Sequence, residues 1–280
     1  MNNMQLYHQV SEACSKHTTE SYSTSFSSAI KLLHKDLRQP IFNIYGFVRF
    51  ADEIVDTFHA HNKSDLLSEF KKETYLAIER KISLNPILNS FQLTINQYNI
   101  DHSLIDAFLY SMELDLSEKK YDRNGYEQYI YGSAEVVGLM CLYIFCEGNT
   151  ANYNILKPYA KSLGAAFQKV NFLRDLKADF EGLERLYFPD CDFRNFTEAD
   201  KKNIEADIQK DFDDAFKGIV MLPNKAKFGV YVAYKYYLSL FKKIKQLDAQ
   251  KIMQQRIRIP DYSKMFIVAK ASLRTQFNIL

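Results

Sequence analysis

QKVNFLRDLKAD, residues 168–179, is the stretch that decides the fold. Asn171, Asp175 and Asp179 are spaced four residues apart, so on an α-helix their side chains form one stripe of oxygen atoms. We call it the second stripe, because a similar one precedes it in the chain. Gln168 stands one turn earlier on the same face, and the flanking positions are mostly apolar. Carboxylates on such a helix are costly to bury unless a cation meets them. The stretch therefore predicts a helix whose acidic face binds a cation.

A matching stripe, the first stripe, lies upstream in residues 45–56 (YGFVRFADEIVD). On a helical wheel Tyr45, Arg49, Asp52 and Asp56 project within about 60° of one another. If the two helices face each other across a cavity, their carboxylates repel one another and favour a divalent metal. Ligand sets made only of oxygen select Mg²⁺, Mn²⁺ or Ca²⁺ over zinc, and Mg²⁺ commonly completes its shell with substrate phosphates.

Groups suited to phosphate stand close to both stripes. The guanidinium groups of Arg49 and Arg174 can each bind two phosphate oxygens. The hydroxyl-rich residues 22–26 (YSTSF) precede a helical pattern, where they either cradle an anion or simply cap the helix. The basic residues near the stripes therefore indicate a phosphate-bearing substrate.

Composition narrows the classes of function. The chain has 280 residues, 47% of them apolar, with 19 Tyr and 21 Phe, which is ample for a large core. A net charge of +2 is too small to produce the positive potential that attracts nucleic acid. The four cysteines lack metal-ligand spacing and are typical of free thiols in a reducing compartment or of core residues. Without a signal sequence or an apolar run of about 20 residues, we expect a cytoplasmic protein.

Helical periodicity dominates, and strand-like alternation is hard to find, so we expect one all-α domain over residues 1–280 without internal repeats. The predicted helices are residues 4–17, 28–33, 36–58, 64–84, 85–97, 104–116, 129–145, 151–179, 201–220 and 223–248. Residues 121–129 are predicted as a loop that passes into a helix, and residues 181–200 as a loop or lid. The basic, amphipathic tail from residue 252 fits either docking on the protein or peripheral contact with an anionic membrane.

Residues 129–145 (YIYGSAEVVGLMCLYIF) form the most apolar predicted helix. Gly132 and Gly138 in it permit close helix packing or leave room for a long apolar ligand, and the sequence leaves both interpretations open. The predicted metal site favours a diphosphate, and the apolar helix favours a long hydrocarbon. A ligand with both parts is an isoprenyl diphosphate. Divalent metal neutralises the leaving diphosphate, and aromatic faces in a dry pocket stabilise the allylic cation left behind.

Six blocks of sequence, in the family's order, resemble the squalene/phytoene synthase family of head-to-head prenyltransferases. They are YSTSF (22–26), YGFVRFADEIVD (45–56), MELD (112–115), GSAEVVG (132–138), QKVNFLRDLKAD (168–179) and RLYFP (185–189). The paired D-x-x-x-D motifs are the specific part of the resemblance, since a single Asp pair of this spacing is common on solvated helices. Glu53 stands where the family usually has the second Asp of its run, and Tyr22 where members carry His or a small residue.

The resemblance implies a single-domain isoprenoid-synthase helical bundle around a central cavity, in which two prenyl diphosphates join through a cyclopropylcarbinyl diphosphate. It implies Mg²⁺, with Mn²⁺ as an alternative, on Asp52, Asp56, Asn171, Asp175 and Asp179. The implied catalytic residues are Asp52, Asp56, Asp175, Asp179, Tyr45 and Arg49. The implied substrate-binding residues are Tyr22, Ser23, Ser25, Phe26, Tyr45, Arg49, Ala134, Val137, Gly138, Gln168, Arg174, Tyr187 and Tyr237. Arg256 or Arg258 is expected to close over a diphosphate.

The RLYFP block and the lack of a C-terminal membrane anchor are more like bacterial phytoene synthases, so the first expectation is phytoene from two geranylgeranyl diphosphates, without NADPH. Dehydrosqualene or squalene from two farnesyl diphosphates is the second. A terpene cyclase shares the spacing of the second stripe but favours Ser or Thr where this chain has Asp175. A non-catalytic homologue would keep the fold alone. Prenyl diphosphates are the expected partners, and the sequence predicts no oligomeric state.

Overall fold

The computed structural model describes residues 2–117, 120–182, 187–189, 191, 196–254, 256–258, 267–268 and 271. Every regular element among those residues is a helix, which confirms the predicted all-α fold class. The elements are α1 (Asn3–Tyr22), α2 (Thr24–Ile30), α3 (Lys35–Asp56), α4 (Lys63–Arg80), α5 (Pro86–Tyr98), α6 (His102–Ser117), α7 (Arg123–Ile130), the π-helix η1 (Tyr131–Glu135), α8 (Val136–Phe145), α9 (Thr150–Gly182), α10 (Glu198–Met221), α11 (Asn224–Lys245) and α12 (Ala249–Ile252).

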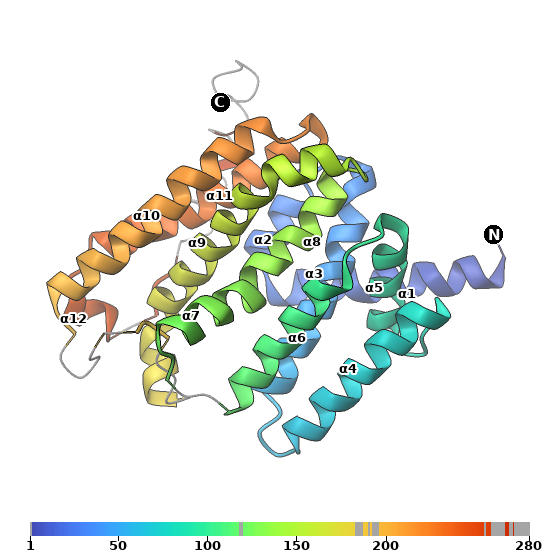
Figure 1. The fold of residues 1–280 in the computed structure, drawn as a ribbon, viewed down its shortest axis with the longest axis horizontal. Helices are drawn as coiled ribbons and strands as arrows, with labels where there is room; N and C mark the ends of the chain where they lie inside the picture. The colour runs from blue at the N-terminus through green and yellow to red at the C-terminus, as the bar shows by residue number, and fades with distance from the viewer. Residues whose placement is uncertain are drawn as a thin grey trace.

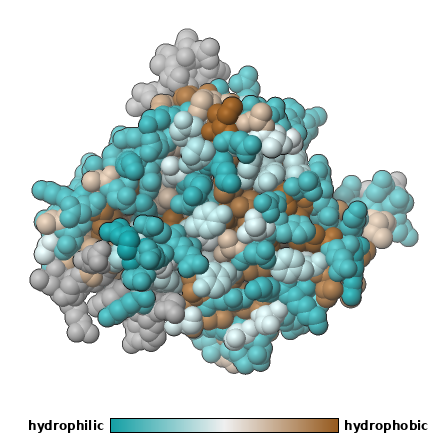
Figure 2. All heavy atoms as spheres, in the orientation of Figure 1, coloured by the Kyte–Doolittle hydropathy of each residue, from teal (hydrophilic) through white to brown (hydrophobic). Residues whose placement is uncertain are grey.

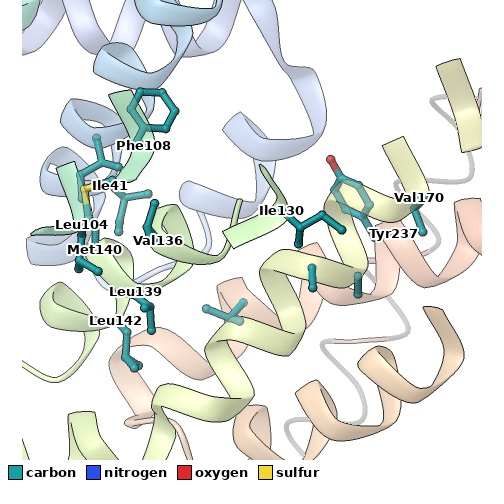
Figure 3. Packing of buried hydrophobic residues seen from close by; sticks show 14 of the residues in the cluster. Ile41, Leu104, Phe108, Ile130, Val136, Leu139, Met140, Leu142, Val170 and Tyr237 are labelled. Atoms are coloured by element: carbon teal, nitrogen blue, oxygen red, sulfur yellow. The ribbon is translucent and has the colours of Figure 1, made fainter. Parts of the chain in front are cut away.

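The helix α8 stands between the two helices that carry the acidic stripes. It contacts α3, which bears the first stripe, and α9, which bears the second, and it also packs on α6. The long helices α10 and α11 cover the outer side of α9 (Figure 1). Figure 3 shows Val136 and Met140 of α8 beside Leu104 and Phe108 of α6 and Ile41 of α3, all of them buried. The apolar helix of the sequence is therefore a central element of the bundle.

The helix α3 has one face in the core and the opposite face toward the stripe side. Phe47 is fully buried, and its ring stacks on Phe91 of α5 with centroids 3.8 Å apart. Phe70 and Phe108 each lie 5.4 Å from the Phe47 ring. Asp52 follows Phe47 by five residues, which turns its side chain about 140° away from the core face. The packing of Phe47 thus fixes the direction in which the first stripe points.

Several predicted boundaries were wrong, and two of the differences have a clear local cause. The first helix ends at Tyr22 rather than at residue 17. The reason is that Thr18 and Thr19 are buried while their hydroxyls donate to the backbone carbonyls one turn earlier, at 2.9 Å each, so polar residues continue the helix. Most of the loop predicted at residues 121–129 is α7, whose first turn is capped by the Asp122 carboxylate accepting from Gly125 N at 2.7 Å.

A further difference is a π-helical turn inside the predicted helix of residues 129–145. In η1 a Cβ on Gly132 would lie 2.5 Å from the Ala107 carbonyl oxygen of α6. A Cβ on Gly164 of α9 would lie 2.7 Å from the Ala134 carbonyl oxygen. The glycines therefore let two helices approach the backbone of η1 directly, and π-helical turns of this kind commonly occur at functional sites.

The surface carries the expected charged side chains. On the face shown in Figure 2, hydrophilic residues predominate and apolar residues appear in patches between them. Across the described ranges, no helix combines the length and the apolar character needed to cross a bilayer. The two ends of the predicted loop or lid (181–200) are helical, since α9 continues to Gly182 and α10 begins at Glu198. Residues 183–186, 190 and 192–195 lie outside the described residues, as does most of the amphipathic tail.

Candidate active site

One cavity of about 1170 Å³ connects the two acidic stripes with the apolar interior of the bundle. Ile41 lines its apolar part and Asp56 its acidic part, and these residues stand 15 positions apart on α3, which is about 22 Å of helix. Leu156 and Asp175 of α9 are separated in the same way, by about 28 Å. The cavity is therefore long, with acidic residues toward one end and apolar residues toward the other.

The cavity brings together nearly all of the sequence-predicted site residues. Its lining includes Tyr22, Ser23, Ser25, Phe26, Tyr45, Arg49, Asp52, Asp56, Ala134, Val137, Gly138, Gln168, Asn171, Arg174, Asp175, Tyr187 and Tyr237. The side chain of Asp179 lies outside the described part of the chain. Gly138 both leaves room in the cavity and permits close helix packing. It lines the cavity, and a Cβ at this position would lie 3.0 Å from the Ala160 carbonyl oxygen.

Asp52 of the first stripe lies in surroundings that disfavour its charged form. Burial, together with the carboxylates of Asp56 and Asp115, raises the pKa of Asp52 to about 8, although the Arg49 guanidinium opposes the shift. Arg49 is only partly available to Asp52: its Nη1 lies 3.9 Å from Asp52 Oδ2, while its Nη2 forms an ion pair with Glu53. The carboxylates of this stripe thus provide a place where an additional cation is stabilising.

Tyr22, which departs from the family pattern, contacts this same arginine. The guanidinium carbon of Arg49 lies 4.4 Å from the centre of the Tyr22 ring, within cation–π distance. The Tyr22 side chain is about half exposed at the end of α1. The tyrosine therefore holds the guanidinium in place from the solvent side.

The described side chains of the second stripe are hydrogen-bonded within the protein. Asp175 accepts from Arg174 Nε at 3.1 Å to each carboxylate oxygen, and Arg256 Nε lies 2.7 Å from Asp175 Oδ1. Tyr237 donates its hydroxyl proton to Asn171 Oδ1 at 3.3 Å, and Asn171 Nδ2 donates to Gln168 Oε1 at 3.4 Å. The orientation of these side chains is therefore set before any ligand binds.

Four aromatic rings link the two stripes. The Phe26 ring centre lies 5.7 Å from that of Tyr45 in the first stripe and 5.7 Å from that of Tyr237, which contacts the second. Phe167 stacks on Tyr237 at 3.9 Å. Burial raises the pKa of Tyr45 to about 12, so its hydroxyl stays neutral. These rings line the cavity with the electron-rich faces that stabilise cations.

Sequence reasoning gave no role to Asp115, Tyr129, Phe167 or Phe172, all of which line the cavity. Tyr129 donates its hydroxyl proton to Asp115 Oδ2 at 2.8 Å, and Tyr187 stacks on Phe172 at 4.0 Å. The MELD block contains Asp115 and was the available signal. The aromatic residues had no such signal, because contacts such as that of Tyr129 on α7 with Phe172 on α9 join separate helices.

The donor set fits Mg²⁺ rather than a metal held by the protein alone. Within the part of the chain that the structure describes, no group of three or more His, Cys, Asp or Glu residues is close enough to hold a metal ion. Asp52 and Asp56 supply oxygen on one side, and Asn171 and Asp175 supply it on the other. Mg²⁺ typically takes one or two carboxylates and completes its shell with waters and substrate phosphates.

The raised pKa of Asp52 predicts a pH-dependent stability for the metal-free protein. Between the unfolded value of 3.8 and the folded value of about 8, the folded chain holds a proton that the unfolded chain has released, so stability falls as pH rises through this window. Asp52→Asn mimics the protonated form and removes that loss. We expect its melting temperature in EDTA to exceed that of the wild type by a margin that grows from pH 4 to pH 8. A constant margin would contradict the assignment.

The family model described as squalene/phytoene synthase matches residues 19–263. The phytoene synthase of Arthrospira platensis is 26% identical over 295 aligned residues, which cover 95% of this chain and 93% of that protein. The 4,4'-diapophytoene synthase of Staphylococcus haemolyticus is also 26% identical, over 68% of this chain and 66% of its own length.

Among solved structures, a dehydrosqualene synthase in complex with a ligand superimposes with a TM-score of 0.83. The two chains are 19% identical, and the match covers 98% of this chain and 99% of the other. At this identity the likeness establishes a shared all-α fold over the whole length.

Proposed function

The chain belongs to the squalene/phytoene synthase family, whose members are prenyltransferases, and on that premise we propose that it condenses two geranylgeranyl diphosphates head to head to phytoene. The family assignment confirms the resemblance seen in the six sequence blocks. The observation that supports the proposal is the single cavity, which has acidic stripes and arginines toward one end and an apolar wall toward the other. A diphosphate with a long hydrocarbon chain matches both ends.

The charged residues bind and orient the diphosphates. Arg49 and Arg174 supply guanidinium groups from opposite stripes. Mg²⁺, or Mn²⁺, would be held by Asp52 and Asp56 on one side and by Asn171 and Asp175, with Asp179, on the other. When bound, the metal neutralises the charge that develops on the diphosphate as the C–O bond breaks.

The aromatic residues stabilise the allylic cation that remains after the diphosphate leaves. After the first diphosphate leaves, the C1 cation is attacked by the double bond of the second substrate, and loss of a proton gives a cyclopropylcarbinyl diphosphate. Its ionisation, rearrangement and loss of a second proton give the C1–C1′ linked hydrocarbon. Phe26, Tyr45 and Tyr237 surround this region and exclude water that would otherwise capture the cation. Because no hydride enters, NADPH is not expected.

Chain length is the finer part of the proposal. The relative matched over 95% of this chain is named a phytoene synthase, which favours geranylgeranyl diphosphate. Dehydrosqualene or squalene formation from farnesyl diphosphate is the alternative, supported by the 4,4'-diapophytoene synthase relative.

Mass spectrometry of the products tests the proposal. The protein is incubated with geranylgeranyl or farnesyl diphosphate and Mg²⁺, with and without NADPH, and with EDTA as the control. We expect a hydrocarbon of twice the substrate's carbon number, formed faster from geranylgeranyl diphosphate and unaffected by NADPH. Preference for farnesyl diphosphate would establish the alternative. A product with the carbon number of one substrate would indicate a cyclase, and no product with either substrate would indicate a non-catalytic homologue.

A further inference from the structure

Asp175 of the second stripe is held by arginines from two different parts of the chain. Arg174, its neighbour on α9, donates from Nε to both carboxylate oxygens at 3.1 Å and from Nη2 to Oδ2. Arg256, which follows α12 and lies 81 positions after Asp175 in the sequence, donates from Nε to Oδ1 at 2.7 Å. Both oxygens of this predicted metal ligand are therefore already occupied by guanidinium groups.

The segment that delivers Arg256 is fixed to the two helices beneath it. Lys177 of α9 donates to the Gln254 carbonyl oxygen at 3.2 Å, and Lys243 of α11 donates to the Arg258 carbonyl oxygen at 2.6 Å. Ile257 between these anchors is buried. Residues 256–258 also line the cavity, so the segment brings Arg256 to the acidic end of the site.

The two stripes are therefore unequal before ligands bind. Asp175 faces two guanidinium groups, whereas Asp52 lies 3.9 Å from an arginine that forms its closer ion pair with Glu53. A divalent ion can reach the first stripe without displacing a short ion pair to Asp52. At the second stripe it has to displace charge-assisted hydrogen bonds, which are the strong ones in proteins.

We propose that Arg256 blocks metal binding to Asp175 until a diphosphate is present, and we call this arrangement the interlock. A diphosphate offers Arg256 and Arg174 several anionic oxygens, so the guanidinium groups move to the phosphate and release the carboxylate. Metal then binds at the second stripe only together with the diphosphate, whereas metal binds at the first stripe without diphosphate. This inference rests on the proposed function and makes Arg256 a positioning residue for the metal as well as a phosphate ligand.

Metal binding without turnover tests the interlock. Mn²⁺ is titrated into the full-length protein and the free ion is measured by electron paramagnetic resonance, with and without inorganic pyrophosphate. Without pyrophosphate we expect Arg256→Gln to bind one additional Mn²⁺ at least about tenfold more tightly than the wild type, as loss of one charge-assisted hydrogen bond implies. With pyrophosphate the wild type should gain the same site, and the difference should shrink.

Two control variants make the result specific. Lys251→Gln removes a positive charge from α12, where Lys251 pairs with Asp248 at 3.0 Å outside the cavity lining, and should leave the Mn²⁺ titration as in the wild type. Adding Asp175→Asn to Arg256→Gln should abolish the gain. Arg256→Lys, which keeps the charge but loses the planar guanidinium, should show a smaller gain and serves if Arg256→Gln does not fold.

Each outcome has a distinct meaning. Equal Mn²⁺ titrations of wild type, Arg256→Gln and Arg256→Lys without pyrophosphate would overturn the interlock, and so would a gain that survives Asp175→Asn. Neither result affects the proposed condensation. If no Mn²⁺ binds to the wild type even with pyrophosphate, the metal-dependent function itself fails.

Discussion

Asp52→Asn is expected to reduce prenyl condensation by several orders of magnitude while leaving the protein folded. The substitution keeps the size and shape of the side chain but removes the negative charge that would bind the metal of the first stripe. Without that charge the departing diphosphate loses its neutralising cation. The measurement is kcat/KM with geranylgeranyl diphosphate and Mg²⁺, together with a thermal melt.

The same substitution should stabilise the metal-free protein at neutral pH, because burial and the nearby carboxylates of Asp56 and Asp115 force Asp52 to take up a proton on folding, whereas an amide needs none. Loss of activity with a gain in melting temperature separates a functional role from a structural one. Asp36→Asn is the matched control, since Asp36 is in the first turn of the same helix and forms a surface ion pair with His34 at 3.2 Å. It should retain wild-type activity. An Asp52→Asn enzyme with more than a tenth of that activity would contradict the assignment.

Phe47→Ala is expected to have the largest effect on stability, a loss of roughly 3–5 kcal/mol in the free energy of unfolding. Phe47 is fully buried and packs against three other phenylalanine rings, so truncation leaves a cavity that the helices can only partly close. Natural domains are stable by about 5–15 kcal/mol, so a loss of this size consumes much of the total. Urea unfolding followed by circular dichroism measures it.

Phe50→Ala provides the control on the same helix. The Phe50 side chain is 38% exposed, and its removal should cost less than about 1 kcal/mol. Comparable losses for the two variants would show that the core face of α3 is misidentified, and with it the direction of the first stripe.

The stripes could be predicted from sequence because helical spacing decides which side chains share a face. Asp52 and Asp56, like Asn171 and Asp175, are one turn apart, and local geometry is enough to place each pair. The apolar stretch of α8 was recognisable for a similar reason, since its composition alone required burial. The cavity and most of its lining could be predicted from these two features.

Features that depend on contacts between distant segments could not be predicted from the sequence. The π-helical turn at η1 follows from backbone approach by α6 and α9 at Gly132 and Gly164, and no single helix encodes it. The ion pair between Arg256 and Asp175 joins residues 81 positions apart in the sequence. The extension of α1 through Thr18 and Thr19 was missed because buried hydroxyls interrupt the apolar pattern by which helices are recognised.

The central claim is that acidic side chains of two separate helices share metal-bound diphosphate at one end of an apolar cavity. Crystals grown with Mn²⁺ and inorganic pyrophosphate, examined by anomalous diffraction, test it most directly. The account predicts manganese peaks within bonding distance of Asp52 or Asp56 on one side and of Asn171 or Asp175 on the other, with pyrophosphate between them. Manganese and pyrophosphate bound elsewhere, with both stripes empty of metal, would contradict it.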